Sequence, residues 1–305
     1  MDDLGLSMLL RRPAELPPAL AVWSLAFAFF LGACWGSFLN VVIARVPAGI
    51  SVVTPRSRCP KCGTQIAARD NLPVLSWILL RGRCRTCQAS ISPRYPMIEL
   101  LLALAGMAAV ARAGWSVEAL ELFVFVFVLT AIAFVDLDTW TVPHPLWIAL
   151  VGTGFAFGAA RMYLHDATEI LLDRAIGAAG GGLVLGAVVV AATGVFRRTG
   201  RIAADQTAMG WGDPLIVVGI GAYLGWRLLP MVILFASVQG TVAALVLRAR
   251  GGLVGDKPIS ETDDWVPPSG AVPFGPFLAL GALEAAFFGD AVLSWVFGTL
   301  DFGGP

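Results

Sequence analysis

Long apolar stretches alternate with short polar segments along the whole chain. A helix of about 20 apolar residues crosses the roughly 30 Å hydrocarbon core of a bilayer. Eight stretches reach this length, so the pattern predicts an all-α polytopic membrane protein with about eight transmembrane helices. The expected spans cover about 18–43, 96–113, 117–137, 145–164, 172–196, 212–229, 230–249 and 271–298.

The segment between the first two spans is the most basic part of the chain. It holds nine of the 21 Lys and Arg residues between Arg45 and Arg94. Basic loops stay in the cytoplasm, so we expect this loop to be cytoplasmic, together with the polar segment 250–270. The expected organisation is a first transmembrane helix over 1–43, a cytoplasmic loop domain over 44–95, and a membrane helical domain over 96–305.

The composition agrees with a membrane protein and limits the classes of partner that we expect. The chain is 57% hydrophobic and 14% charged, with a mean hydropathy of +0.78, whereas soluble domains carry about 25% charged residues. Its net charge at pH 7 is zero, which gives no support to nucleic-acid binding. We therefore expect contact with membrane lipid and no nucleic-acid partner.

Four of the five cysteines form two C-x-x-C pairs inside the basic loop. They are Cys59, Cys62, Cys84 and Cys87. Two such pairs at this separation supply the four thiolates of a closed, tetrahedral structural zinc site. A loop with little apolar core would gain its folding energy from the metal. Reduced, redox-active or disulfide-linked thiols are the alternative.

Two aspartates stand at the edges of expected spans. Asp136 ends the third span, and Asp213 starts the sixth in Gly210-Trp211-Gly212-Asp213. Carboxylates near membrane depth are costly and usually functional. Two that meet share a proton, which is the acid and base chemistry of peptide hydrolysis without a covalent intermediate.

Each aspartate also has a plainer interpretation. Asp213 followed by Pro214 is a good N-cap and first-turn pair that would start a helix without any chemistry. Asp136 and Asp138 could be ordinary interfacial residues at a helix end. The carboxylates alone therefore do not decide between catalysis and helix capping.

An ordered series of motifs resembles the type IV prepilin peptidases, which are Gly-x-Gly-Asp membrane aspartyl proteases. The resemblance covers most of the chain. Besides both Cys pairs and Asp136, the matching segments are 36–47, 70–73, 81–85, 94–96, 99–100, 209–213, 221–226 and 273–277.

The resemblance implies an aspartyl endopeptidase of the bacterial inner (cytoplasmic) membrane with its active site facing the cytoplasm. Its substrates would be type IV prepilins or type II pseudopilins, cut at their basic leader. Asp136 and Asp213 would be the catalytic pair, and the four cysteines would bind zinc. Many members of the family also methylate the new N-terminus with S-adenosylmethionine. The candidate residues for that site are Ser37, Asn40, Arg45 and Glu99.

The sequence departs from the family pattern near both aspartates. His144 stands where Asp or Asn is usual, Leu215 where Lys is usual, and Thr207 where Glu is usual. The alternatives left open are a peptidase without methyl transfer and a catalytically silent scaffold for pilin-like partners. A proton-coupled transporter is disfavoured, because both aspartates are expected at one face of the membrane instead of near its midplane.

Overall fold

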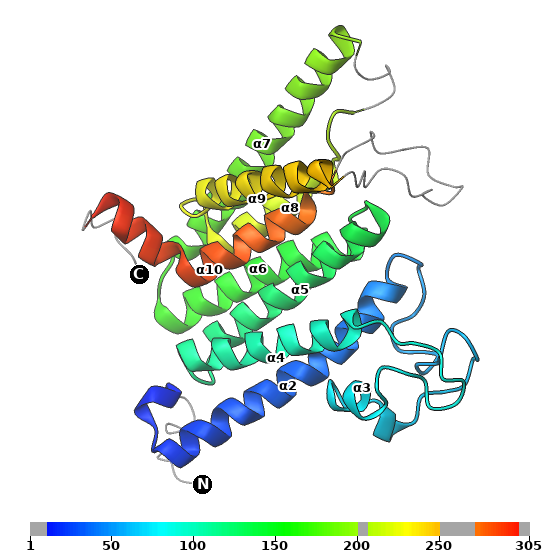
Figure 1. Ribbon diagram of the computed structural model, residues 1–305. Coiled ribbons are helices and arrows are strands. Elements are labelled where there is room, and N and C mark those ends of the chain that lie inside the picture. The colour runs from blue at the N-terminus through cyan, green and yellow to red at the C-terminus, as the bar shows by residue number, and fades with distance from the viewer. Residues whose placement is uncertain (1–10, 201–206, 251–271, 299–305) are drawn as a thin grey trace. The chain divides into compact units, whose positions relative to one another are not determined.

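The computed structural model describes residues 11–200, 207–250 and 272–298 and is helical throughout these ranges (Figure 1). The described part contains no named strand, only two isolated bridges, at Arg58–Gln65 and Arg83–Ser90. The helices are η1 (Pro13–Glu15), α2 (Pro18–Arg45), η2 (Ala68–Asp70), α3 (Leu75–Leu79), α4 (Arg94–Ala113), α5 (Val117–Thr139), α6 (His144–His165), α7 (Glu169–Arg198), α8 (Gly212–Leu224), α9 (Leu229–Ala249) and α10 (Gly275–Phe297).

Seven of the described helices are long and apolar enough to cross a membrane, so the expected all-α polytopic fold is confirmed. The expected sixth span is α8, which has only 13 residues and a length of about 20 Å. It ends at Gly225, where a φ of +69° turns the chain before α9 begins. Apart from Arg227, the apolar run of the sequence continues through this turn, so hydropathy alone overestimated the length of the helix. The expected cytoplasmic segment 250–270 lies, apart from residue 250, outside the described residues.

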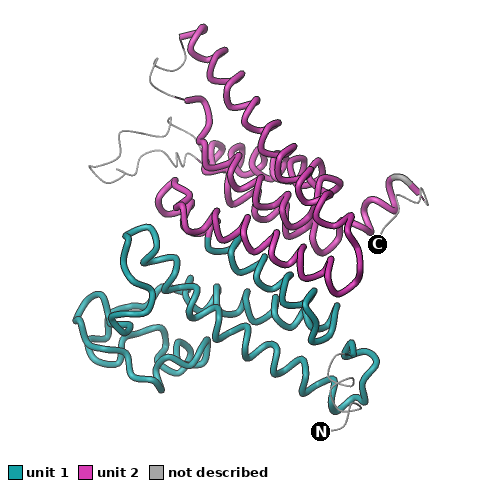
Figure 2. The backbone as a smooth tube through the Cα atoms, turned by 180° about the vertical axis from the view of Figure 1, so that it is seen from behind, with its two compact units in different colours: residues 1–131 teal, residues 132–305 magenta. Residues whose placement is uncertain are grey.

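The chain divides into two compact units, unit 1 (Met1–Ala131) and unit 2 (Ile132–Pro305) (Figure 2). This division falls inside α5. The domains expected from the sequence, with a loop domain over 44–95, were defined by their function. The compact units are defined by packing and do not test them, so that division stays a prediction.

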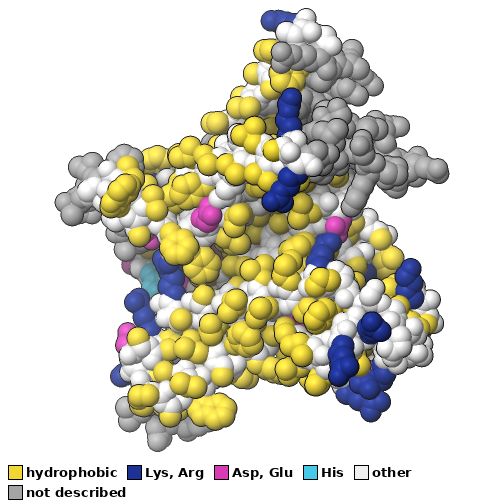
Figure 3. All heavy atoms as spheres, in the orientation of Figure 1, with side chains coloured by type: hydrophobic (Ala, Val, Ile, Leu, Met, Phe, Trp, Pro, Cys, Tyr) yellow, Lys and Arg dark blue, Asp and Glu magenta, His cyan; other side chains and the backbone are white. Residues whose placement is uncertain are grey.

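Unit 1 is built on α2 and α4, which pack along each other. Leu39 of α2 and Ile98 and Leu102 of α4 are completely buried. The loop between the two helices carries the short η2 and α3, and Lys and Arg side chains gather over it (Figure 3). Basic side chains therefore concentrate at one end of an apolar helical pair.

Unit 2 is organised around the short helix α8, which packs against α6, α7, α9 and α10. Nine of its 13 residues are buried, on all sides of the helix. A helix that is apolar all round belongs in the interior of a bundle. The longer helices, in contrast, expose large apolar side chains such as Leu183 and Leu234, which fits contact with lipid.

Candidate active site

Asp136 lies in the last turn of α5 and is buried, with 7% of its surface exposed. The backbone N–H of Gly275, the first residue of α10, donates a hydrogen bond to its carboxylate. The approach is close, because a Cβ on Gly275 would lie 2.5 Å from Asp136 Oδ2. Only glycine fits this position without moving the carboxylate.

Asp213 lies in the first turn of α8 and is also buried, with 9% exposed. The helix begins at Gly212, and its N-cap residue, Trp211, makes no side-chain cap hydrogen bond. Asp213 is thus inside the helix instead of capping it. The capping interpretation of this aspartate does not describe the structure.

The two carboxylates, called the carboxylate pair below, come together within unit 2. The charge of Asp136 acts electrostatically on Asp213. The segments that carry them meet as well, because a Cβ on Gly212 would lie 2.8 Å from the side-chain atom Cγ2 of Val142, six residues after Asp136. Two buried carboxylates this close resist simultaneous ionisation, so they are suited to sharing one proton.

The residues that depart from the family pattern lie near the two acids in sequence and replace neither of them. His144 is the first residue of α6, and its ring centre lies 6.2 Å from that of Trp147. Pro214 and Leu215 are part of the first turns of α8, where Pro214 is buried. Thr207 lies before α8. None of them supplies a third carboxylate to the pair.

The four cysteines of the basic loop converge in unit 1, and we call them the thiol cluster. Their sulfur atoms all lie within 4.8 Å of one another, and Cys59 Sγ is 3.8 Å from Cys87 Sγ. Four Zn–S bonds of about 2.3 Å in a tetrahedron require sulfur atoms about 3.8 Å apart. The donor set and its spacing therefore fit a zinc ion.

The two C-x-x-C turns repeat one backbone design. Cys59 N–H donates to Thr64 O at 2.9 Å, and Cys84 N–H donates to Ala89 O at 2.8 Å. The residue after each second cysteine, Gly63 or Gln88, has a positive φ and donates back to the first cysteine of its turn. Each turn thereby presents two sulfur atoms on the same side.

The local environment makes the thiols unequal. Hydrogen bonds with the side chain and backbone of Thr64 lower the pKa of Cys62 to about 6. At Cys87 a backbone hydrogen bond from Ala89 lowers the pKa, but desolvation and the other cluster thiols outweigh it and raise the pKa to about 11. A bound cation favours the thiolate form at every ligand, so metal binding would remove this difference.

An ion pair ties the rest of the loop to the thiol cluster. Arg85 Nη2 lies 2.6 Å from Asp70 Oδ1, and Arg85 Nε lies 2.8 Å from Asp70 Oδ2. The hydrogen bond and charge of Arg85 hold the pKa of Asp70 below its usual value. The contact joins the second C-x-x-C turn to the segment between the two turns.

Three of the four residues expected at a cofactor site come together where α2 meets α4. Ser37 hydrogen-bonds Glu99, whose Oε2 also accepts the backbone N–H of Val74 at 2.7 Å. Asn40 Nδ2 donates to Tyr95 O at 3.2 Å, one turn before Glu99. Val74 has a φ of +61° and sits at the centre of a γ-turn, a conformation that is rare for a β-branched residue. Glu99 therefore holds a strained loop segment against the helices.

Arg45, the fourth expected residue, forms hydrogen bonds with the neighbouring loop instead. Its guanidinium donates to the backbone oxygens of Ser51 at 2.9 Å and of Pro55 at 2.7 Å. The side chain thus shapes the segment that leads to the thiol cluster. A direct role of Arg45 in cofactor binding stays a prediction.

Gly275 is the site residue that sequence reasoning did not single out. Its segment, 273–277, was part of the resemblance, but nothing in the pattern assigned it a partner. The close approach to Asp136 exists only in the folded chain.

The fold and the site together define a class: a multi-pass helical membrane protein with a buried carboxylate pair and a loop bearing four clustered thiols. Residues 30–113 match the bacterial peptidase A24 N-terminal domain, and residues 123–245 match the type IV leader peptidase family. The chain belongs to the type IV leader peptidase family. No solved structure gives a significant match.

Similar proteins in bacteria carry a consistent name. The chain is 36% identical to the prepilin leader peptidase/N-methyltransferase of Myxococcus xanthus, over 91% of this chain and 92% of the relative. It is 34% identical to the protein of the same name from Aeromonas salmonicida, over 91% and 94% of the two chains. A Legionella pneumophila protein with that name is 28% identical over 86% of this chain. The relationship therefore covers both compact units.

Proposed function

We propose that this protein is an aspartyl endopeptidase of the bacterial inner membrane that removes the basic leader of type IV prepilins or type II pseudopilins on the cytoplasmic side. The observation that carries the proposal is the carboxylate pair, two buried acids on helices distant in the chain that act on one another. The names of the relatives, prepilin leader peptidase/N-methyltransferase, support leader cleavage of prepilins.

The pair is suited to hydrolysis through water. The ionised carboxylate takes a proton from a water molecule, and the protonated one donates a hydrogen bond to the carbonyl oxygen of the cleaved bond. The N–H of Gly275 holds the Asp136 carboxylate in one orientation, so this acid is set before substrate binds. Burial excludes competing water from both groups.

We also propose that the protein methylates the new N-terminus with S-adenosylmethionine, which supplies the methyl group. Ser37, Asn40 and Glu99 would hold the cofactor, because they form one polar group in unit 1 with a carboxylate acceptor at its centre. Zinc on the thiol cluster would be structural, since four thiolates leave no position for a water molecule.

Replacing either acid by its amide tests the peptidase. Asp136→Asn and Asp213→Asn should each lower the cleavage rate of a prepilin by about 10²–10⁴-fold or more, because the proton can no longer be exchanged between the acids. Asp138→Asn is the matched control, since Asp138 lies two residues away on an exposed position of the same helix. Cleavage is measured by mass spectrometry with purified protein in detergent or vesicles.

The same assay, run with S-adenosylmethionine, separates the two activities. A product that is cut and also carries the mass of one added methyl group shows methylation, and a product that is only cut shows a peptidase without it. Full cleavage by either amide variant would remove the pair from the mechanism. A wild-type protein that binds the prepilin without cutting it would favour the silent scaffold.

A further inference from the structure

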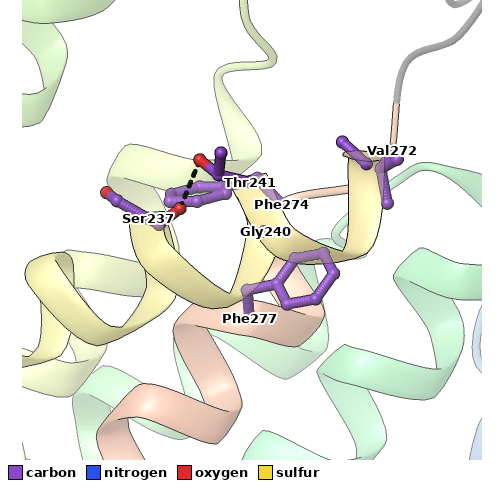
Figure 4. Close-up of a pocket in the computed structure, with 7 residues that line it drawn as sticks. Ser237, Gly240, Thr241, Val272, Phe274 and Phe277 are labelled. Atoms are coloured by element: carbon purple, nitrogen blue, oxygen red, sulfur yellow. Dashed lines mark hydrogen bonds between the residues drawn. The ribbon is translucent and has the colours of Figure 1, made fainter. Parts of the chain in front are cut away.

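Most of the exposed apolar surface in the described part of the chain belongs to helices that are long enough to cross a membrane. A hollow of about 340 Å³ between α9 and the start of α10 is part of this surface, and Figure 4 shows Gly240, Phe274 and Phe277 around it. Neither acid of the carboxylate pair lines this hollow. Lipid chains can cover apolar surface on such helices, so it indicates no further partner.

The short helix α3 lies outside these spans, in the loop between α2 and α4, and also exposes apolar side chains. Leu75, Ile78 and Leu79 are 58%, 57% and 78% exposed, whereas Ser76 is only 8% exposed. A surface helix in water turns its apolar side chains inward and its polar ones outward. The orientation of α3 is the reverse, so its outer face is suited to an apolar partner.

Hydrogen bonds fix α3 in this orientation. The backbone N–H of Leu72 donates to Ser76 Oγ at 3.0 Å, and this hydroxyl donates to Arg69 O at 3.2 Å. On the next residue, Trp77 Nε1 donates to Ile91 O at 3.0 Å. Rotating α3 to bury its leucines would break these bonds and leave the polar groups without partners. The apolar face therefore stays outward.

The start of α3 is held where α4 enters the membrane. The backbone N–H of Val74, directly before α3, donates to Glu99 Oε2 at 2.7 Å. Glu99 lies five residues after Arg94, where the candidate span of α4 begins, or about 7.5 Å along the helix. Tyr95, at the start of the same span, is exposed, and Tyr favours the membrane–water interface. α3 therefore begins at the depth of this interface, at the loop end of unit 1 (Figure 1).

Exposed basic side chains flank the apolar face of α3. Arg69 precedes it, and Arg81 and Arg83 follow it directly. Segments that lie on a membrane surface combine apolar side chains with Lys and Arg, because anionic lipid headgroups attract the basic groups. The same arginines would repel the basic leader of a prepilin. The charge around α3 thus favours lipid over substrate as the partner.

We propose that α3 docks on the surface of the bilayer that α2 and α4 cross. Leu75, Ile78 and Leu79 enter the boundary between headgroups and lipid chains, and Arg81 and Arg83 bind anionic headgroups. Glu99 and the lipid then hold this part of the loop from two sides. The inference goes beyond the proposed peptidase function and does not depend on it.

Photo-cross-linking identifies the partner directly. The full chain, with photoreactive benzoylphenylalanine in place of Leu79, is reconstituted in vesicles of equal parts of phosphatidylglycerol and phosphatidylcholine, irradiated and analysed by mass spectrometry. Lipid adducts should form at position 79. The same group in place of Gln65, an exposed polar residue of the first C-x-x-C segment, should give none. Position 79 without lipid adducts, or cross-linked to a second copy of the chain or to added prepilin instead, would overturn the proposal.

Hydrogen exchange tests the role of the arginines. Exchange of the backbone over residues 72–80 should be about 10-fold slower in these vesicles than in pure phosphatidylcholine, because basic residues near the surface are attracted to anionic lipid. Arg81→Gln with Arg83→Gln should abolish this difference. Arg56→Gln with Arg58→Gln is the matched control and should keep it, since these are two exposed arginines of the same loop with the same spacing. Exchange that ignored phosphatidylglycerol, or that changed equally in both double variants, would refute docking on anionic lipid.

Discussion

At the scale of residues, the candidate chemistry depends on how a few polar groups are held. Asp136 receives a backbone hydrogen bond from Gly275, and Asp213 is set by the first turn of the buried helix α8. A hydrogen bond from a backbone N–H group costs little conformational entropy, because the fold already holds that group in place. The orientation of Asp136 is therefore set by the main chain, whereas Asp213 is placed by its helix and faces the charge of the Asp136 side chain.

Gly275→Ala tests this dependence. The new Cβ would lie 2.5 Å from Asp136 Oδ2 and 3.1 Å from Ile216 Cδ1, so the carboxylate must move. We expect kcat to fall by about 10²-fold, because displacing a reacting group by about 1 Å has a cost of this order. Gly186→Ala is the control, since its Cβ would meet nothing within 4 Å. Equal rates for the two variants in the cleavage assay would show that Gly275 has no positioning role.

At the scale of elements, α8 is the central helix of unit 2, although it is the shortest of the helices described in that unit. It touches four other helices and is buried on all sides. Its contact with α7 is backbone to backbone, because a Cβ at Gly177 would lie 2.8 Å from Gly221 O. Small residues at such contacts let helices approach closely in a bilayer, where no hydrophobic force draws them together.

The contact between α7 and α8 yields a prediction about stability. Gly177→Val should separate the helices and lower the free energy of unfolding by about 1–3 kcal/mol, as overpacking does in other cores. The rate of prepilin cleavage should fall together with this stability, because α8 carries Asp213. Gly180→Val, one turn along α7, should change neither, because a Cβ there meets nothing within 4 Å. Thermal unfolding in detergent measures the first effect; a Gly177→Val protein as stable as wild type would contradict the close contact.

At the scale of the whole molecule, the two family matches follow the two compact units. Residues 30–113 lie in unit 1, which holds the thiol cluster and Glu99, and 123–245 lie mostly in unit 2, which holds the carboxylate pair. Two separate cores support two separate groups of polar residues. Damage to one unit should therefore leave the core of the other intact.

Metal removal makes this independence measurable. Chelation of the purified protein, or Cys62→Ser with Cys87→Ser, should speed hydrogen exchange of the backbone over residues 57–92 by about 10-fold or more, because the loop loses its main source of folding energy. Exchange in α8 should stay unchanged. Cys34→Ser is the control, since Cys34 lies within α2, away from the cluster in sequence. A loop whose exchange did not respond to chelation would argue against a structural metal.

Much of the fold was predictable from sequence, but the limits of the elements were not. Span length and average hydropathy predicted a helical membrane protein, and seven described helices confirm it. The turn at Gly225 was missed, because only the single charged residue Arg227 interrupts the apolar residues around it. The convergence of Ser37, Asn40 and Glu99 was expected only through the resemblance, and their role in methyl transfer stays a prediction.

The sequence by itself determined the class of the protein, the two C-x-x-C pairs and the two candidate acids, since these depend on composition and on spacing within short segments. Only the tertiary structure decided which groups meet: the amide of Gly275 with Asp136, Val142 with Gly212, and the phenyl rings of α10 with Gly240 of α9. Such contacts join residues far apart along the chain, and they exist only after the helices have packed, which no local pattern encodes.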